Sequence, residues 1–314
     1  MTLLYRDDRF LQHQTGNHPE SADRIQGIHA MLDKHDATKR CHENPWEPVP
    51  EEELESVHTE AYLKQFLQIS QQGGGRLDTD TVASEQSWDV ARLAAGAVTD
   101  AVRRVIDGDD PRALCLVRPP GHHALPERAM GFCLLNNIAL AARSAIDRHG
   151  LDRVLIVDWD VHHGNGSQDI FWRDEQVGFL SIHRWPFYPG SGEAAETGEG
   201  PGLGTTRNLP VTMGTSRQDY LARFQQELED FAARINPQLV LLSAGFDAHR
   251  LDPVGSLDLE TEDYRPLTRQ VTQIADSYCG GRLVSMLEGG YHVEALAQSV
   301  SVHLDCLMQE PPGD

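Results

Sequence analysis

The feature that most constrains the fold is a series of short apolar segments that alternate with longer amphipathic ones. The short segments are rich in Val, Ile and Leu, which is typical of strands buried on both faces of a sheet. The long segments follow helical patterns, and this alternation indicates βαβ units. We therefore predict an α/β fold with an open, mostly parallel sheet flanked by helices. The predicted strands are 113–117, 154–157, 177–182, 239–242 and 283–287, and the predicted helices are 21–35, 88–106, 135–149, 216–235 and 262–279.

No internal repeat and no linker-like segment divides the chain. The segment 190–204, rich in Gly, Glu and Thr, is too short for a linker and is typical of an ordered surface loop. A chain of 314 residues is long, but one large α/β domain can reach that length. We therefore expect a single domain over residues 1–314, with residues 1–20 and 308–314 at its periphery.

Charge and composition narrow the classes of partner. The net charge of −21 disfavours binding to nucleic acid, because such binding relies on contacts from Lys and Arg to phosphates. No window approaches eighteen uninterrupted apolar residues, so we expect no membrane span. An acidic surface is compatible with a cationic partner, although it more often serves solubility.

The cellular compartment is predicted from the first residues and from the cysteines. The opening segment MTLLYRDDRFLQHQ shows neither a secretory signal nor a transit peptide, and we therefore expect a cytoplasmic protein. The five cysteines are odd in number and lack C-x-x-C spacing, which argues against a disulfide framework and against a cysteine zinc cluster. We expect free thiols.

A metal site is predicted where the strand 154–157 runs directly into polar residues. Asp158, Asp160 and His162 follow at every second position, so in an extended chain their side chains share one face. Carboxylate oxygen and imidazole nitrogen suit zinc or another divalent first-row metal. Acidic residues also end strands for structural reasons, but the Asp-x-Asp-x-His pattern after an apolar strand favours the metal site.

Three other predicted strands also end in polar residues. Strand 113–117 leads to His122 and His123, strand 239–242 to Asp247, and strand 283–287 to Tyr291. Sites in open parallel sheets form outside the carboxyl ends of the strands, so these segments can converge on one crevice. A histidine pair or a tyrosine after glycines is unremarkable alone, but the coincidence of all of them indicates a catalytic site.

The residue types predict the chemistry. Activation of water at a metal needs a base, a polarised carbonyl and a donor to the oxyanion. His123 is the candidate base, which later protonates the leaving amine, and His122 is its electrostatic neighbour. Tyr291 is the candidate oxyanion donor. Asp158 and Asn165 are expected to support the two imidazoles through their Nδ1 atoms.

At these residues the chain resembles the histone deacetylase and acetylpolyamine amidohydrolase family, which shares an arginase-like α/β fold. The resemblance covers nearly the whole chain, in order. It rests on HPES and Arg24 near the start, and on RPPGHHA, GFCLLNN, DWDVHHGNGSQ, SIHRWPFYPGSG, SAGFDAH and EGGY further along. The resemblance implies an arginase-deacetylase-like fold and a class II-like deacetylase.

The resemblance also implies two cations and a set of substrate-binding residues. One catalytic Zn²⁺ is implied on Asp160, His162 and Asp247, and His122, His123 and Tyr291 match the family's catalytic residues. A K⁺ ion is implied near Asp158 and the side chain of Ser181, with the backbone carbonyls of Asp160, His162 and Ile182. Gly131 and Phe132 match the wall of an acyl-lysine tunnel, Tyr188 a second aromatic residue of the site, Val254 the gate, and Asp80 the rim aspartate, although the local match at Asp80 is weak.

Departures from particular branches of the family refine the expectation. Asn165 follows the class II pattern, and Tyr291 distinguishes the chain from a weakly active branch that lost the oxyanion donor. Val254 stands where a polyamine-selective relative carries a glutamate, so the gate lacks a countercharge for a polycation. The single Asp247 in SAGFDAH lacks the paired Asp-x-Asp of two-manganese ureohydrolases, which disfavours arginase activity.

Three functions are therefore considered. The leading expectation is a zinc-dependent deacetylase that removes an acetyl or short acyl group from the acylated lysine of a protein or peptide. The second is an amidohydrolase of acetylpolyamines or other small acylated amines. The third is a silent module that binds acyl-lysine, which a missing catalytic residue would favour. A homo-oligomer is compatible with the sequence, which leaves the oligomeric state open.

Overall fold

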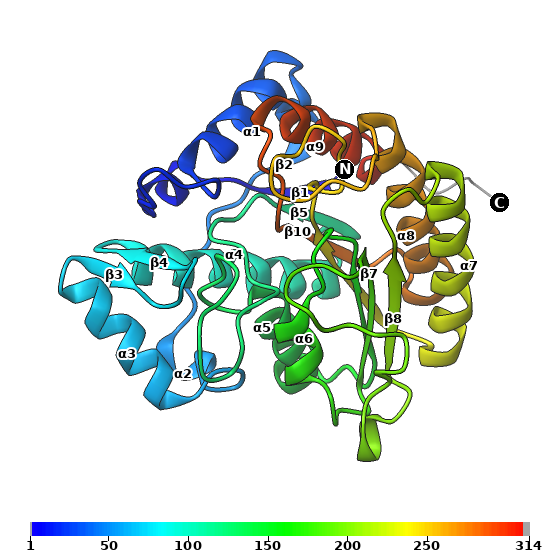
Figure 1. Cartoon of the computed structure of the whole chain (residues 1–314), viewed down its shortest axis with the longest axis horizontal. Coiled ribbons are helices and arrows are strands. Elements are labelled where there is room, and N and C mark those ends of the chain that lie inside the picture. Colours follow the sequence, from blue (N-terminus) through cyan, green and yellow to red (C-terminus); the bar gives the residue numbers. More distant parts are fainter. Residues whose placement is uncertain (1, 310–314) are drawn as a thin grey trace.

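The computed structural model describes residues 2–309, and one eight-stranded sheet forms its centre (Figure 1). Every pair of neighbouring strands in this sheet is parallel. A separate antiparallel pair consists of β3 (Gly74–Arg76) and β4 (Val82–Ser84). Across the main sheet the order is β2 (Cys41–His42), β1 (Thr2–Tyr5), β5 (Arg112–Cys115), β10 (Leu283–Leu287), β9 (Leu239–Ala244), β6 (Val154–Asp158), β7 (Val177–Arg184) and β8 (Thr206–Val211).

Helices follow most of the strands, as the alternating pattern predicts. Short 3₁₀ turns lie between several of these elements, and the last of them, Thr261–Asp263, directly precedes α8. The helices are α1 (Ala22–Lys34), α2 (Glu51–Leu54), α3 (Glu60–Gln71), α4 (Ser87–Asp107), α5 (Asn137–Arg143), α6 (Asn165–Ile170), α7 (Arg217–Ile235), α8 (Tyr264–Cys279) and α9 (Val293–Leu307).

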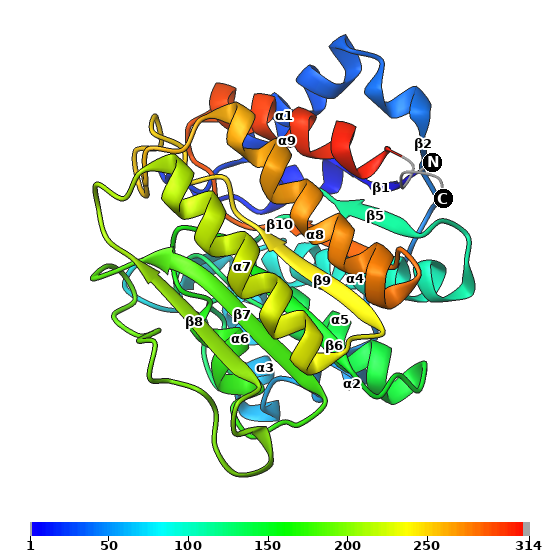
Figure 2. The same cartoon turned by 90° about the vertical axis from the view of Figure 1, so that its right-hand side faces the viewer.

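The sheet is buried between two layers of helices. Residues of α3, α4 and α5 pack in one apolar cluster, and residues of α1, α7, α8 and α9 pack in another (Figure 2). Strand β6 shows how the sequence allows this, because Val154 and Ile156 belong to the first cluster whereas Leu155 and Val157 belong to the second. An apolar run without alternation is therefore explained by burial on both faces.

Local signals in the sequence fix the ends of the long helices. The Ser216 hydroxyl accepts a hydrogen bond from the amide of Asp219 at the start of α7, which ends at Asn236 in a left-handed conformation. A capping box of Glu260 and Asp263 precedes α8, and Gly280 ends it with a φ of 60°. These ends explain why the predicted helices 216–235 and 262–279 agree closely with the structure.

The N-terminal segment differs from its expected position at the periphery. Strand β1 lies inside the sheet, paired with both β2 and β5, and its four residues are buried. A segment of four residues before a polar turn gives too short a pattern to predict a strand. The other segment expected at the periphery, 308–314, is described only as far as residue 309, so most of that expectation lies outside the described residues.

Further differences concern elements after the first strand. The predicted helix 135–149 begins at Asn137, and its α-helical part ends at Arg143, where a π-helical turn continues to Arg148. Strand β8 and helix α9 were not predicted as elements. No helix among the described residues is long and apolar enough to cross a membrane.

Candidate active site

The predicted site residues follow four strands that are neighbours in the sheet. These are β5, β10, β9 and β6, whose carboxyl ends lie along one edge of the sheet. Strands β10 and β9 stand between β5 and β6 although they come later in the chain. Such a change in strand order opens a crevice at the carboxyl ends of the strands, which is where ligands bind in open α/β sheets. The topology therefore brings the four polar segments together.

Asp160, His162 and Asp247 form a buried group of three potential metal ligands. His162 Nδ1 lies 3.0 Å from one oxygen of Asp160 and 3.1 Å from one oxygen of Asp247. The second oxygen of Asp160 accepts a hydrogen bond from the amide of Gly289, and that of Asp247 accepts one from the amide of Val161. Each carboxylate is thus held by the backbone with one oxygen directed at His162.

This group fits a zinc ion in donor chemistry and spacing. Ligands at about 2.0–2.1 Å from a tetrahedral zinc ion are separated by roughly 3.3 Å, close to the separations found here. Burial and the neighbouring charge of Asp160 raise the pKa of Asp247, so the close pair of carboxylates resists full ionisation without a cation. A divalent ion would relieve this repulsion by displacing protons from the group.

The tandem histidines meet the two supporting residues that the sequence predicts. His122 Nδ1 lies 2.9 Å from Asp158 Oδ2, and His123 Nδ1 lies 2.7 Å from the Oδ1 atom of Asn165. The two rings are 4.0 Å apart between centroids. In each case Nδ1 is engaged; His122 Nε2 lies 3.9 Å from Asp160 Oδ1, and the ring of His123 lines the pocket described below.

The two imidazoles differ in their affinity for protons. Burial opposes the charge on His122, but Asp158 and Asp160 overcome it and raise its pKa to about 10. Burial and the charges of His122 and His162 lower the pKa of His123 well below its ordinary value. Neighbouring groups whose pKa values are moved in opposite directions are typical of an acid and base pair.

Tyr291 lies on the turn between β10 and α9 and reaches the same crevice. Gly290, with a φ of 122°, directly precedes it and adopts a conformation that L-residues rarely take. The ring lies between the guanidinium of Arg24, 5.0 Å from its centroid, and the ring of Phe132, 5.7 Å away and nearly perpendicular. These contacts hold the phenol in a fixed orientation.

A pocket of about 230 Å³ leads to this group, and all five predicted substrate-binding residues line it. Its wall is largely aromatic, which suits an apolar chain. Phe187, which was not singled out in the sequence, stacks on His162 at 5.2 Å between centroids. The lining residues are Asp80, His123, Gly131, Phe132, His162, Phe187, Tyr188, Val254 and Tyr291.

Asp80, predicted at the rim, lies in the wall of the pocket. Asp80 Oδ1 accepts a hydrogen bond from the amide of Gly131, and the neighbouring Thr81 hydroxyl accepts one from the amide of Phe132. Gly131 and Phe132 have φ values of 57° and 70°, which are uncommon for a residue with a side chain. The segment around Asp80 therefore fixes the aromatic wall.

The two side chains implied in potassium binding are opposite each other in the sheet. Asp158 and Ser181 are register partners on β6 and β7, and both are fully buried. Asp158 Oδ1 accepts a hydrogen bond from the amide of Asp160, and the Ser181 hydroxyl is hydrogen-bonded with the ring of His183. Asp158 is also two positions before Asp160, one of the three potential metal ligands.

Glu288 is a buried residue that opens the EGGY segment but was not among the predicted site residues. Its carboxylate accepts hydrogen bonds from the amides of Gly121 and His122 and from the hydroxyl of Ser243. Cys133 and His122 lie close enough to form a second group of donor atoms with it. Burial and the charge of Glu288 raise the pKa of the Cys133 thiol well above its ordinary value.

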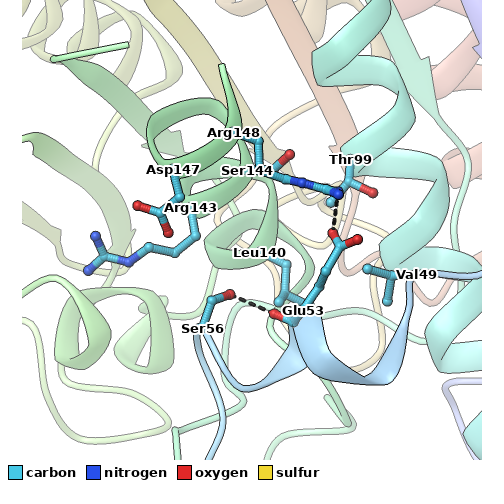
Figure 3. A pocket seen from close by; sticks show the side chains of 9 residues that line it. All are labelled: Val49, Glu53, Ser56, Thr99, Leu140, Arg143, Ser144, Asp147 and Arg148. Atoms are coloured by element: carbon cyan, nitrogen blue, oxygen red, sulfur yellow. Dashed lines mark hydrogen bonds and ion pairs between the residues drawn. The ribbon is translucent and has the colours of Figure 1, made fainter. Parts of the chain in front are cut away.

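Another surface pocket, of about 190 Å³, contains none of the predicted site residues (Figure 3). It lies beside α2, α4 and α5, and an ion pair of 2.6 Å between Glu53 and Arg148 crosses it. Ser56 donates a second hydrogen bond to the backbone carbonyl of Glu53. The ion pair joins α2 to the π-helical turn.

Comparisons of the sequence and of the fold with known proteins point to one family. The sequence profile of the histone deacetylase domain matches residues 18–307. The chain is 39% identical over 275 residues to the histone deacetylase-like amidohydrolase of Pseudomonas aeruginosa, covering 87% of this chain and 72% of that protein. It is 38% identical to the polyamine deacetylase HDAC10 of Homo sapiens, covering 98% of this chain and 48% of that one. The solved HDA15 HD domain has a TM-score of 0.92 and 38% identity, covering 98% of this chain and 91% of that structure.

Proposed function

This chain belongs to the histone deacetylase family, and we propose that it is a zinc-dependent amidohydrolase that removes an acetyl or other short acyl group from acylated lysine. One observation carries the proposal. The donor group of Asp160, His162 and Asp247 lies beside two supported imidazoles, and His123, His162 and Tyr291 line one pocket. This combination supplies each function that amide hydrolysis at a metal needs.

The residues divide the work as follows. Zinc held by the donor group would polarise the amide carbonyl and make water more acidic. His123, whose pKa is lowered by burial and by the charges of His122 and His162, takes a proton from the attacking water and passes it to the leaving amine nitrogen as the carbon–nitrogen bond breaks. His122, kept protonated by Asp158, stabilises the developing negative charge. The hydroxyl of Tyr291 donates a hydrogen bond to the oxyanion, and the products are a short carboxylic acid and a free amine.

The pocket supports acylated lysine as the substrate. The rings of Phe132 and Tyr188 line it, and such walls suit the four methylene groups of a lysine side chain. The side chain of Tyr188 is 37% exposed and contacts His123 edge to face, so it joins the entrance to the catalytic residues. Val254 at the rim offers no charge to a second ammonium group.

A small acylated amine is the second candidate substrate. The similarity to the human protein named polyamine deacetylase HDAC10 and the net charge of −21 favour it. Val254 weighs against it, because a polycation needs a countercharge. Turnover of acetylputrescine and of an acetyl-lysine peptide, compared at equal concentration, separates the two. A strong preference for the diamine would reverse our ranking.

A potassium ion beside the catalytic group belongs to the same proposal. Its support is the pairing of Asp158 and Ser181 across β6 and β7, with the backbone carbonyls of Asp160, His162 and Ile182 nearby in the chain. Burial raises the pKa of Asp158, so a cation would help to keep this carboxylate ionised. Activity in potassium and in tetramethylammonium salts of equal ionic strength tests this.

The central experiment removes the metal and the phenol separately. Chelator-treated protein should lose turnover of acetyl-lysine peptides and recover it with zinc. Tyr291→Phe should lower turnover by roughly two or more orders of magnitude. Tyr264→Phe is the matched control, because it removes a buried hydroxyl outside the pocket that has no partner among the described residues. Full activity of Tyr291→Phe would refute the mechanism, and binding without hydrolysis in metallated protein would favour a silent acyl-lysine-binding module.

A further inference from the structure

The carboxylate of Asp252 connects two segments of the pocket that are far apart in sequence. Its Oδ1 atom accepts hydrogen bonds of 2.9 Å from the amides of Val254 and Gly255. Its Oδ2 atom accepts a hydrogen bond of 2.6 Å from the amide of Tyr291. The residue is buried, with 8% of its surface exposed. The side chain of Asp252 therefore contacts both the gate at Val254 and the turn that carries Tyr291.

The turn that carries Tyr291 depends on contacts of this kind. Strand β10 ends at Leu287 and α9 begins at Val293, so the residues between them have no regular backbone ladder. Arg24 donates hydrogen bonds to the carbonyls of Glu288 and Gly290. The contact with Asp252 fixes the amide of Tyr291 itself, and a charged acceptor makes such a hydrogen bond strong.

The gate segment is held in a similar way. Ser256 and Asp258 have φ values of 78° and 60°, a conformation that is unfavourable for residues with side chains. Such a backbone persists only where its surroundings impose it. The Asp252 carboxylate accepts hydrogen bonds from the two amides immediately before Ser256. The backbone carbonyl of Asp247 accepts a hydrogen bond from the amide of Ser256 itself.

We propose that Asp252 is a positioning residue that couples the gate at Val254 to the phenol of Tyr291. The proposal rests on the proposed function, because it takes Tyr291 as the oxyanion donor. Through its two oxygens, Asp252 sets the width of the entrance and the place of the hydroxyl together. Loss of the Oδ2 contact affects the chemical step, and loss of the Oδ1 contacts affects substrate binding.

The substitution Asp252→Asn tests the coupling in a double-mutant cycle with Tyr291→Phe. In the asparagine variant, one of the two segments faces an NH₂ group that cannot accept a hydrogen bond, and the side chain, displaced by the amide opposite, also loses its alignment with the other segment. We expect turnover to fall by about ten- to a hundredfold, because small displacements of catalytic groups have effects of that size on the rate. In the Tyr291→Phe background the same substitution should lower turnover less than twofold, because the group that it misplaces is gone.

Substrate binding should respond differently. The affinity for an acetyl-lysine peptide, measured by fluorescence anisotropy, should weaken to the same extent with and without the phenol, since Val254 is disturbed in both backgrounds. Asp263→Asn is the matched control, because Asp263 is 6% exposed and accepts the amide of Glu260 outside the pocket. It should lower the melting temperature and leave turnover and affinity unchanged. Additive losses of turnover in the cycle would overturn the proposal.

A measurement on the protein without any Asp252 substitution keeps the test independent of folding and of activity. The chain has seven tyrosines, so isotope-labelled tyrosine gives few amide signals in a nuclear magnetic resonance spectrum, and Tyr291→Phe identifies the signal of residue 291. A carboxylate acceptor at 2.6 Å predicts a downfield amide with slow hydrogen exchange. A signal at the position of a solvent-exposed amide would refute the contact. Absence of turnover in the wild-type protein, with this signal downfield, would instead refute the proposed function.

Discussion

The substitution Gly289→Ala should weaken zinc binding although it replaces none of the three zinc ligands. Gly289 lies between Glu288 and Gly290, directly against the metal group. A methyl group on its Cα would stand 2.5 Å from Asp160 Oδ2 and closer still to Asp247 Oδ2. Cβ atoms do not approach other atoms within 3.0 Å, so the Asp160 oxygen has to move by at least 0.5 Å and the Asp247 oxygen by more.

The expected loss of zinc affinity depends on how little the ligand distances at a zinc site can vary. Ligand distances at zinc vary by only about 0.2 Å, and two of the three ligands would be displaced by more than that. Loss of supporting contacts around zinc sites weakens binding by about 10- to 100-fold. Because two ligands move together, we expect the upper end, an increase of about 100-fold in Kd, or about 2.7 kcal/mol. Gly289 itself has no unusual φ, so the backbone accepts alanine.

The assay is a competition titration of zinc against a chromophoric chelator, together with the rise in Tm on zinc addition. Gly178→Ala is the matched control, because its methyl group would meet Ile235 at 2.7 Å near the start of β7, at the opposite end of that strand from the site. The control should be less stable but should bind zinc normally. Normal zinc affinity and turnover in Gly289→Ala would show that Asp160 and Asp247 do not hold the metal.

Three further predictions concern the base, the gate and acid stability. Asn165→Ala, which removes the partner of the His123 Nδ1 atom, should lower kcat by about tenfold or more at unchanged Tm; unchanged kcat contradicts the role of that hydrogen bond. Val254→Glu should shift the ratio of kcat/KM towards acetylputrescine over acetyl-lysine peptides by about tenfold, and an unchanged ratio argues against a gate at this position. Burial lowers the pKa of His13 and His58 to about 4 and that of His303 to about 3, so these rings take up protons in the unfolded chain near pH 6.5 but not in the folded one. The free energy of unfolding should therefore be highest above about pH 6.5 and should fall as the pH is lowered below it, by up to about 1.4 kcal/mol per pH unit for each ring. Urea titrations at about pH 7.5 and about pH 5 measure this fall. Equal stability at both pH values would contradict the lowered pKa values of these three histidines.

The centre of the fold was predictable because its strands are buried on both faces. Burial of that kind leaves a continuous apolar run, as in the first four residues of β6, and the polar residues that follow each run reveal the carboxyl edge. Strand β8 lacks this signal. Its sequence TRNLPV includes Arg207, Asn208 and Pro210, because it is an edge strand of the main sheet with two partly exposed positions. A pattern of apolar residues therefore finds the middle of this sheet and misses its margins.

The residues that support the site were less predictable than those that perform the chemistry. His122 and Asp160 stand next to buried strands in segments with a clear resemblance to a family. Asp252 and Glu288 act through backbone amides, and an amide is present at nearly every residue, so no residue type marks the partner. Glu288 contacts Gly121, which is 167 positions away in the chain. Only the folded structure brings such partners into view.

The strand order has a consequence for biosynthesis. Strands β9 and β10 are translated after β5 and β6, yet they lie between them in the sheet. Until they emerge from the ribosome, β5 and β6 each keep one unpaired edge, and such edges promote aggregation. Contacts between segments far apart in the chain also form slowly. A product truncated before β9 would therefore expose one unpaired edge on β5 and one on β6, and it would lack Asp247, so we expect it to aggregate.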